Sequence, residues 1–297
     1  MTKESRPKKP DGDDLRWGTE RRLAFIEHRL FWLGEINRAD LAERFDVSMS
    51  QASADIARYL ARNPRGIHYD KSAKRYIAGA AFHPTLSAPD ASRLLGELRL
   101  VEAGLMPASQ TALGEVPPFD ATPLPERKID THVLRTILQA IRRRASVEAL
   151  YQSMSRPERS RRTLEPHALA FDGFRWHARA FDRETGEFRD FVLGRLSKTK
   201  EADTATSDAR DDADWNAFVD LLIAPHPGLT EAQRRAIALD YGIERDSARL
   251  RVRRAMLFYA LKRLGLDVDP SSRPPNVQQI VLLNRDEIAR FGGSPQT

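Results

Sequence analysis

The segment from residue 38 to residue 62 constrains the fold most, because two amphipathic helical patterns follow each other there with a very short connection. Apolar residues recur at helical spacing on both sides of that connection. We expect a helix at 38–45, a turn at Asp46–Ser48 and a longer helix from about residue 49 to residue 62. Two helices joined in this way predict a helix-turn-helix.

The segments on either side of this pair complete a larger unit. Residues 17–34 carry leucines and an isoleucine spaced for one face of a helix. Residues 66–79 have Tyr69 and Tyr76 on either side of a polar turn, which is typical of a β-hairpin. Three helices followed by a hairpin indicate a winged helix-turn-helix, and we assign it residues 15–84.

The second helix of the pair has polar and basic residues away from its apolar face, and Ser48 or Ser50 would cap it. Burial of its apolar residues leaves five side chains outside: Ser50, Gln51, Ser53, Asp55 and Arg58. Small polar side chains can approach base edges, and glutamine can pair with adenine through two hydrogen bonds. Basic side chains contact phosphates and give affinity. The predicted DNA-binding residues are Ser48, Ser50, Gln51, Ser53, Arg58, Arg62, Lys71, Lys74 and Arg75, with Arg44 and Arg65 as further phosphate contacts.

The same helical pattern is also compatible with a protein–protein module or a structural lid. The charge balance favours nucleic acid, since 48 lysines and arginines exceed 42 acidic residues and give a net charge of +6. The absence of cysteine excludes disulfides, thiol chemistry and cysteine zinc sites, and it fits a reducing compartment. No apolar run reaches membrane-spanning length, and the start lacks the apolar core of a secretory signal. We therefore expect no membrane partner.

The 297 residues divide into further segments by composition and periodicity, and together they predict a multidomain α+β protein. We expect a disordered tail at 1–14, a helical connector with a Pro-rich linker at 85–144, a small antiparallel β-domain at 145–202 and a mixed α/β extension at 203–297. The finer elements expected are a helix at 87–104 capped by Ser87 or Asp90, the linker at 106–126, a helix at 129–144, an acidic linker at 201–213, helices at 213–223, 230–241 and 247–264, and a strand at 276–284.

Alternation within the β-domain places charged and aromatic side chains together, because residues two apart share a face of a strand. In 175–181 the odd-numbered residues, including His177 and Arg179, point one way, whereas Trp176 and two alanines point toward a core. Guanidinium groups suit phosphate or carboxylate, and aromatic rings suit bases. This face predicts an anionic ligand, although a solvated face or a surface of inter-domain salt bridges would show the same pattern.

Residues 145–200 resemble a WYL domain, a small Sm-like β-barrel. The matching segments are VEALYQS, RRTLEPHAL, FRWHARAFD and FRDFVLGRL. At the three positions that name the domain the chain has Trp176, His177 and Ala178, so histidine and alanine replace tyrosine and leucine. This variant and the order of the parts resemble bacterial WYL regulators that control phage-defence operons.

The resemblance implies a cytoplasmic, nucleoid-associated, homodimeric repressor that binds an inverted-repeat operator in double-stranded DNA. The C-terminal extension would help to dimerise it, and the WYL domain would sense a nucleic acid or nucleotide that relieves repression. The expected ligand-binding residues are Tyr151, Ser153, Arg162, His167, Arg175, His177, Arg179, Arg189 and Arg195. His167 could equally be a structural hydrogen-bonding residue.

Other chemistry finds little support in the sequence. The seven histidines lack metal-ligand spacing, and neither a phosphate-binding glycine loop nor a GxSxG motif is present. We expect no enzymatic activity, no cofactor and no metal. The basic run Arg142–Arg144 fits a helix C-terminus or a DNA-backbone contact, and 249–265 fits a dimer or core helix. An activator, or an adaptor whose β-face binds single-stranded nucleic acid, remains an alternative function.

Overall fold

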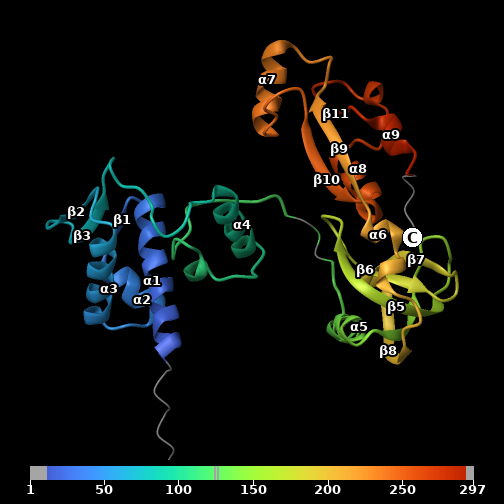
Figure 1. Ribbon diagram of the computed structural model, residues 1–297, viewed down its shortest axis with the longest axis horizontal. Coiled ribbons are helices and arrows are strands. Elements are labelled where there is room, and N and C mark those ends of the chain that lie inside the picture. Colours follow the sequence, from blue (N-terminus) through green and yellow to red (C-terminus); the bar gives the residue numbers. More distant parts are fainter. Residues whose placement is uncertain (1–11, 124, 126, 292–297) are drawn as a thin grey trace, which may run out of the picture. The chain divides into compact units, whose positions relative to one another are not determined.

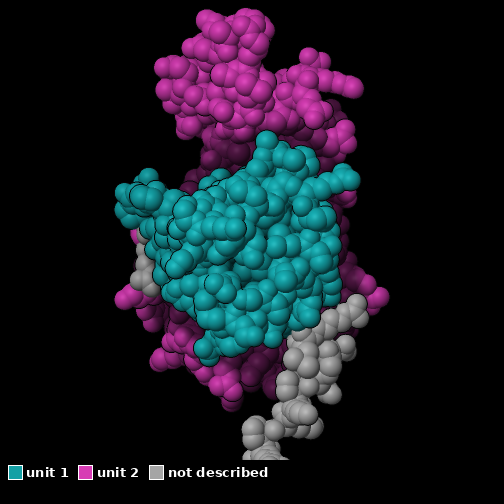
Figure 2. Space-filling model, turned by 90° about the vertical axis from the view of Figure 1, so that its left-hand side faces the viewer, with its two compact units in different colours: residues 1–124 teal, residues 125–297 magenta. Residues whose placement is uncertain are grey.

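The computed structural model describes residues 12–123, 125 and 127–291. The chain forms two compact units, residues 1–124 and residues 125–297, which Figure 2 shows in different colours. Most of the disordered tail predicted at 1–14 lies outside the described residues, but its last three residues belong to helix α1, which begins at Gly12. Each unit has hydrophobic core clusters of its own.

The first unit contains four α-helices and a small sheet within its described residues (Figure 1). Their bounds are α1 (Gly12–Trp32), β1 (Glu35–Ile36), α2 (Arg38–Phe45), α3 (Met49–Arg62), β2 (Ile67–Asp70), β3 (Arg75–Ala78) and α4 (Ala91–Glu102), followed by the 3-10 turn η1 (Ala108–Gln110). The predicted helix-turn-helix and hairpin are confirmed. Strand β1, which the sequence analysis did not predict, pairs with β3 and gives the antiparallel order β1-β3-β2.

Side-chain caps fix the boundaries of the helix pair. Asn37 and Asp40 form a reciprocal capping box at the start of α2. Helix α2 ends at Asp46, whose left-handed backbone (φ 51°) turns the chain sharply. The Ser48 hydroxyl oxygen accepts a hydrogen bond from the Gln51 amide at 3.1 Å and so starts α3. At α4 the cap is Asp90, one of the two predicted residues.

The core of the first unit joins α1 to the helix pair. Leu23, Ile26 and Leu30 of α1 pack with Ile56 and Tyr59 of α3, all essentially without solvent exposure. The helical spacing of these apolar residues predicted the two helices, and the same residues form the contact between α1 and α3. Helix α3 is thereby anchored along one side, and its opposite side stays exposed.

A buried carboxylate ties the end of this domain to its core. Glu27 of α1 is 0% exposed and accepts hydrogen bonds from the Tyr59 hydroxyl at 2.9 Å and from the backbone amides of Thr85, Leu86 and Ser87. Four donors satisfy the two carboxylate oxygens, which a buried charge requires. Glu27 therefore holds residues 85–87 against α1 and α3.

The second unit begins with a helix packed on a five-stranded antiparallel sheet (Figure 1). The bounds are α5 (Thr131–Arg143), β4 (Ala145–Tyr151), β5 (Ser160–Phe171), β6 (Trp176–Asp182), β7 (Glu187–Val192), the 3-10 turn η2 (Leu193–Arg195) and β8 (Leu196–Thr204). The strand order is β7-β6-β5-β4-β8. A closed barrel was expected; it is not confirmed, because no ladder joins β7 to β8 within the described residues.

The C-terminal part of the second unit adds helices and a three-stranded antiparallel sheet in the order β10-β9-β11. Its elements are the 3-10 turn η3 (Ala209–Asp211), α6 (Ala213–Asn216), β9 (Phe218–Pro225), α7 (Glu231–Asp240), β10 (Ala248–Arg253), the 3-10 turn η4 (Arg254–Met256), α8 (Leu257–Leu264), the 3-10 turn η5 (Pro270–Ser272), β11 (Ile280–Leu282) and α9 (Arg285–Ala289). The α7 helix agrees with the predicted 230–241.

Three of the sequence-based predictions for this part are wrong. The helix expected at 213–223 is a single turn, because β9 buries Val219, Leu221 and Ile223 with the two-residue period of a strand. The helix expected at 247–264 begins only at Leu257, since the preceding residues pair with β9. The acidic linker expected at 201–213 is structured: β8 continues into it, and Asp212 is buried.

Removal of the Glu27 carboxylate is expected to destabilise the first unit. In Glu27→Ala the buried Tyr59 hydroxyl and three backbone amides lose their acceptor, so the free energy of unfolding should fall by about 3 kcal/mol. Urea unfolding of the full chain measures this change. The matched control is Glu43→Ala on the exposed side of α2, which should change it by less than about 0.5 kcal/mol. Equal effects would contradict the assigned role of Glu27.

Candidate nucleic-acid interface and anion pocket

The side chains of α3 that were predicted to contact DNA differ in whether they already have a hydrogen-bond partner within the protein. Ser50 and Arg62 are exposed and have no partner within the described part of the chain. Ser48 is occupied as the helix cap, and the Ser53 hydroxyl donates to the Met49 carbonyl oxygen at 2.8 Å. Ser50 and Arg62 are therefore available for an external partner, whereas Ser48 and Ser53 are committed to the helix.

Asp55 corrects the sequence-based assignment of this face. It was placed on the outer side of α3, but it is 0% exposed and forms an ion pair with Arg22 of α1 at 2.6 Å. The Gln51 amide nitrogen donates to the same Asp55 oxygen at 3.0 Å, and the Arg58 guanidinium lies 3.5 Å from the other oxygen. Gln51 and Arg58, two of the side chains predicted to contact DNA, are thus held by a buried carboxylate.

The hairpin presents two lysines at a tip that is closed by side-chain hydrogen bonds. Asp70 accepts hydrogen bonds from the Ser72 hydroxyl and from the Ser72 and Ala73 amides, and these bonds, the hydroxyl first, lower the pKa of Asp70. The turn leaves Lys71 and Lys74 exposed and without a partner in the described chain. Both lysines are available to phosphates.

The remaining basic candidates of the first unit differ in their partners. Arg75, also predicted to contact DNA, forms an ion pair with Glu35 of β1. Arg44 donates to the Gln110 carbonyl oxygen at 3.2 Å, whereas Arg65 is exposed. A DNA contact by Arg75 would require it to leave or share Glu35.

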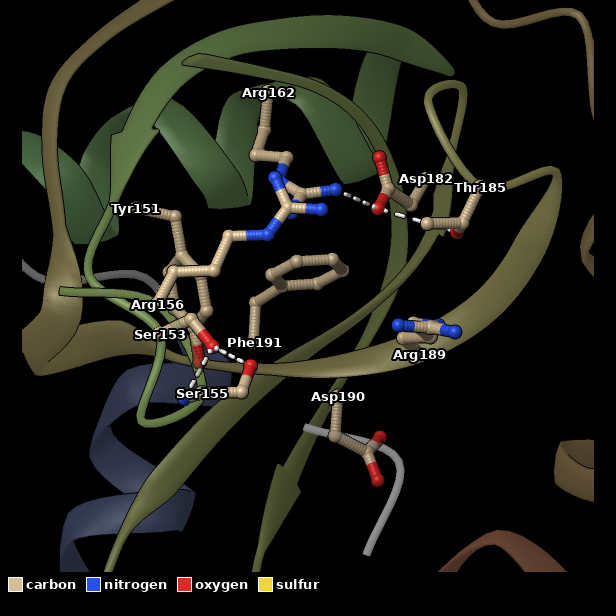
Figure 3. Close-up of a pocket in the computed structure, with 10 residues that line it drawn as sticks. All are labelled: Tyr151, Ser153, Ser155, Arg156, Arg162, Asp182, Thr185, Arg189, Asp190 and Phe191. Carbon is tan, nitrogen blue, oxygen red and sulfur yellow. Dashed lines mark hydrogen bonds and ion pairs between the residues drawn. The ribbon is translucent and has the colours of Figure 1, made fainter. Parts of the chain in front are cut away.

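Four of the nine expected ligand residues line one pocket on the β-domain, drawn in Figure 3. They are Tyr151, Ser153, Arg162 and Arg189, joined in the lining by Ser155, Arg156, Asp182, Thr185, Asp190 and Phe191. The Tyr151 and Phe191 rings pack edge to face at 5.1 Å and are almost fully buried. Arginines from β5, from β7 and from the β4–β5 loop therefore line the same pocket as these two aromatic rings.

Each arginine of this pocket already has a carboxylate partner. Arg162 is buried and donates to Asp182 at 2.7 Å, and it also pairs with Glu184. Arg189 pairs with Glu187, which is mostly exposed. Exposed ion pairs are weak because water screens them. An incoming anion could therefore displace Glu184 and Glu187, while the Arg162–Asp182 pair would keep one guanidinium in place.

Arg175 and Arg195 lie elsewhere and line a second pocket with Trp176, Arg127 and Lys128. The expectation that Trp176 points into the core is wrong, because its side chain is 46% exposed. Arg175 is tied to Asp172 at 3.2 Å, and His177 contacts the same carboxylate at 3.1 Å. Burial raises the pKa of Asp172, but the hydrogen bonds from His177 and from backbone amides outweigh it and lower the value to about 2.

The last three expected ligand residues lie beneath the C-terminal part. Arg179 is 1% exposed and donates two hydrogen bonds to Asp212, at 2.7 and 2.9 Å, and one to Asp190 at 3.3 Å. His167 contacts Asp212 at 2.9 Å, and the His177 ring packs 5.0 Å from that of Tyr259. The prediction that these side chains share an open face fails, because both faces of β6 are covered.

The two carboxylates around Arg179 respond differently to burial. Burial raises the pKa of Asp190, and Arg179 offsets this only in part. Burial also acts to raise the pKa of Asp212, but hydrogen bonds from His167 and Arg179 outweigh it and lower the value. Asp212 receives both hydrogen bonds of a bidentate pair from Arg179 in addition to the contact with His167. The Tyr259 hydroxyl donates to Asp190 at 3.2 Å.

Strand β7 connects the pocket to this buried network. Successive side chains of a strand point to opposite faces. Arg189, Asp190 and Phe191 all belong to the pocket lining, and in Figure 3 the Asp190 carboxylate points to the opposite side of the strand from the Phe191 ring. There it contacts Arg179 and Tyr259. A displacement of β7 at the pocket would therefore act on contacts with α8 of the C-terminal part.

Neither a membrane span nor a metal cluster is found where the chain is described. Among residues 12–123, 125 and 127–291, no helix has the length and apolar character needed to cross a bilayer. Over the same ranges, no group of three or more histidine or acidic side chains is arranged to hold a metal ion.

Comparison with known proteins assigns the parts of the chain. Residues 18–100 match the BrxR transcriptional regulator winged helix-turn-helix domain, 132–201 match the WYL domain, and 218–288 match the BrxR transcriptional regulator C-terminal dimerization domain. Relatives named DNA-binding transcriptional repressor CapW cover nearly the whole chain. The relative from Escherichia coli (strain KTE188) is 39% identical over 275 residues, 92% of this chain and 91% of its own length.

The chain belongs to the CapW family. The Stenotrophomonas maltophilia CapW is 40% identical, with 93% of each chain covered. The Pseudomonas aeruginosa CapW is 38% identical over 293 residues, which cover 97% of this chain and 98% of that relative. The resemblance to WYL regulators stated from the sequence is thereby confirmed. Along this chain the matched domains follow in the order winged helix, WYL domain and C-terminal dimerization domain.

The Arg179 network is expected to hold the WYL domain and the C-terminal part together. In Arg179→Met the carboxylates Asp190 and Asp212 lose their shared cation, so the free energy of unfolding of the second unit should fall by about 3–5 kcal/mol. Calorimetric unfolding of the full chain measures the loss.

The matched control removes an exposed ion pair from the same unit. Arg210→Met breaks only the surface pair with Asp208, and its free energy of unfolding should stay close to that of the parent protein because water screens an exposed ion pair. If Arg179→Met were as mild as Arg210→Met, the network would not carry the junction.

Proposed function

We propose that the chain is a DNA-binding transcriptional repressor that acts as a homodimer. The observation that supports this most directly is the α3 surface: a capped, anchored helix with Ser50 and Arg62 free on its exposed side. Membership of the CapW family, whose members are named DNA-binding transcriptional repressors, agrees with it. The match to a dimerization domain at 218–288 supports the homodimer.

The operator follows from the symmetry of such a dimer. Two recognition helices related by a two-fold axis fit successive major grooves, about 34 Å apart, on an inverted repeat. In this proposal Ser50, Gln51 and Arg58 face base edges. The phosphate contacts come from Arg62, Lys71 and Lys74, which have no competing partner in the described structure.

We propose that the regulatory ligand binds in the pocket lined by Tyr151, Ser153, Arg162 and Arg189. Its cations suit a phosphate-containing ligand, a nucleotide or a nucleic acid, and exposed Glu184 and Glu187 would yield to it. Ligand binding would shift β7 and, through Asp190, the contacts to Arg179 and Tyr259. Such coupling requires that the ligand bind the released state more tightly than the operator-bound state. On the resemblance to WYL regulators, the regulated genes would belong to a phage-defence operon.

Operator binding is tested with the DNA upstream of the chain's own gene. The full-length protein should shift this fragment at moderate salt, and Arg62→Ala should weaken binding to specific and unrelated duplexes alike. The slope of log affinity against log salt should fall by about one, because one phosphate contact is lost. Arg210→Ala, in the other unit, is the charge-matched control. Absence of any sequence-specific shift would rule out a repressor of its own promoter.

Ligand sensing is tested on the preformed operator complex. Single-stranded oligodeoxynucleotides of about ten residues, mononucleotides and inorganic phosphate are added separately, and release is followed by fluorescence anisotropy. At least one of these probes should release the parent protein, and Arg189→Ala should need about tenfold more of it, since a charge-assisted contact is lost. Loss of operator binding by Arg189→Ala itself would contradict the assignment of ligand binding to this pocket and of DNA binding to the first unit. Tighter binding on addition of the probe would favour an activator.

A further inference from the structure

We propose that Asp55 is a positioning residue for operator recognition: its buried carboxylate orients the Gln51 amide and so sets which base Gln51 reads. The inference rests on the proposed function, in which the exposed side of α3 faces the operator. It concerns a residue that makes no DNA contact itself, because Asp55 is fully buried. Its contacts reach the exposed face of the recognition helix from behind.

The carboxylate is fixed from outside its own helix. Arg22 of α1 donates to Asp55 through its Nε atom at 2.6 Å, and the Arg22 Nη2 atom also donates to the Thr19 hydroxyl oxygen. The Arg22 side chain is itself largely buried, at 15% exposure. A buried, charged carboxylate is tolerated in a protein core when a group of opposite charge is paired with it. Asp55 therefore has a defined place that depends on the packing of α1 against α3.

The same oxygen that accepts from Arg22 also accepts from Gln51. The Gln51 Nε2 atom lies 3.0 Å from Asp55 Oδ2, one helical turn away. A carboxylate can only accept hydrogen bonds, so the amide nitrogen, and not the amide oxygen, must face it. This leaves the Gln51 Oε1 atom and the second N–H of Nε2 available to a partner.

An amide held in this way offers one acceptor and one donor side by side. Adenine presents the complementary pair in the major groove, its N6 amino group as a donor and N7 as an acceptor. A rotating glutamine amide could also offer two donors to guanine. The Asp55 contact restricts that freedom before binding, so less rotamer freedom is lost on contact with an A·T pair. The specificity of Gln51 thus becomes a property of the Arg22–Asp55–Gln51 chain of contacts.

A purely structural role for the ion pair makes a different prediction. If Asp55 only tied α3 to α1, its loss would weaken binding to all DNA sequences by the same factor. A positioning role changes the preference at one base pair in each half-site. The preference profile over single base-pair substitutions of the operator therefore separates the two roles.

The experiment compares full-length variants on the upstream fragment with every base pair of one half-site substituted in turn. Gln51→Ala should reduce the preference for A·T at one position by about tenfold, within the range for a bidentate contact. The double variant Arg22→Met with Asp55→Ala removes both buried charges together, which keeps the core uncharged and the fold intact. It should lower the preference at the same position by about five- to tenfold and leave the preferences elsewhere within about twofold, except at a base pair contacted by Arg58, which also loses its Asp55 partner.

Two further variants make the comparison decisive. Adding Gln51→Ala to the double variant should bring the loss at that position to that of Gln51→Ala alone and no further, because Asp55 acts on this base pair only through Gln51. Asp55→Asn keeps the volume and an acceptor for Arg22, and its preference should lie between the parent and Gln51→Ala. Glu43→Gln, which removes an exposed charge from α2, should leave the profile unchanged.

The outcomes distinguish the inference from the function on which it rests. An unchanged preference in the folded double variant, a uniform loss at all positions, or loss of the fold in both the double variant and Asp55→Asn would overturn the positioning role. An unchanged profile in Gln51→Ala would show that Gln51 reads no base, which overturns the role of Asp55 while leaving operator binding in place. No shift by the parent protein would instead reject the proposed function.

Discussion

The second unit depends on the ion pairs that the buried guanidinium of Arg179 forms with Asp190 and Asp212. A cation with 1% exposure remains stable only while its acceptors stay in place, and here they come from different parts of the chain. Asp190 belongs to β7 of the WYL domain, whereas Asp212 precedes α6 and the C-terminal sheet. The WYL sheet and the C-terminal part are therefore joined by a charged network that neither part could satisfy alone. Displacement of either carboxylate would leave the buried Arg179 guanidinium with only part of its ion-pair network.

This network gives the anion pocket a physical route to the C-terminal part. Arg189, Asp190 and Phe191 of β7 line the pocket, and Asp190 also contacts the network, so a short strand carries both functions. The proposed sensor thus needs no large movement within the WYL domain. A small displacement of β7 would act on Tyr259 of α8, within the segment that matches a dimerization domain. In the proposed mechanism, ligand binding alters the dimer and thereby the spacing of the recognition helices.

The parts that the sequence predicted well are those determined locally. The helix-turn-helix depends on apolar spacing and on caps a few residues away, such as Ser48 with Gln51, and these are visible in one short window. Asp55 was misplaced because its partner Arg22 lies 33 residues earlier and is brought near only by tertiary packing. Strand β10 was predicted as a helix although its apolar residues alternate with arginines, because this short segment was merged with the helical pattern that follows it at 257–264. Both faces of β6 are buried because a later segment covers it, which alternation alone does not reveal.

The central claim is that a ligand in the Tyr151–Arg189 pocket acts on the C-terminal part through β7. Hydrogen–deuterium exchange of the full chain, with and without a short single-stranded oligodeoxynucleotide, measures this most directly. We expect slower exchange at 151–156 and 187–191 together with a change at 257–264, and the Arg189→Ala variant should show neither. Protection confined to the pocket, with residues 257–264 unchanged, would contradict the account.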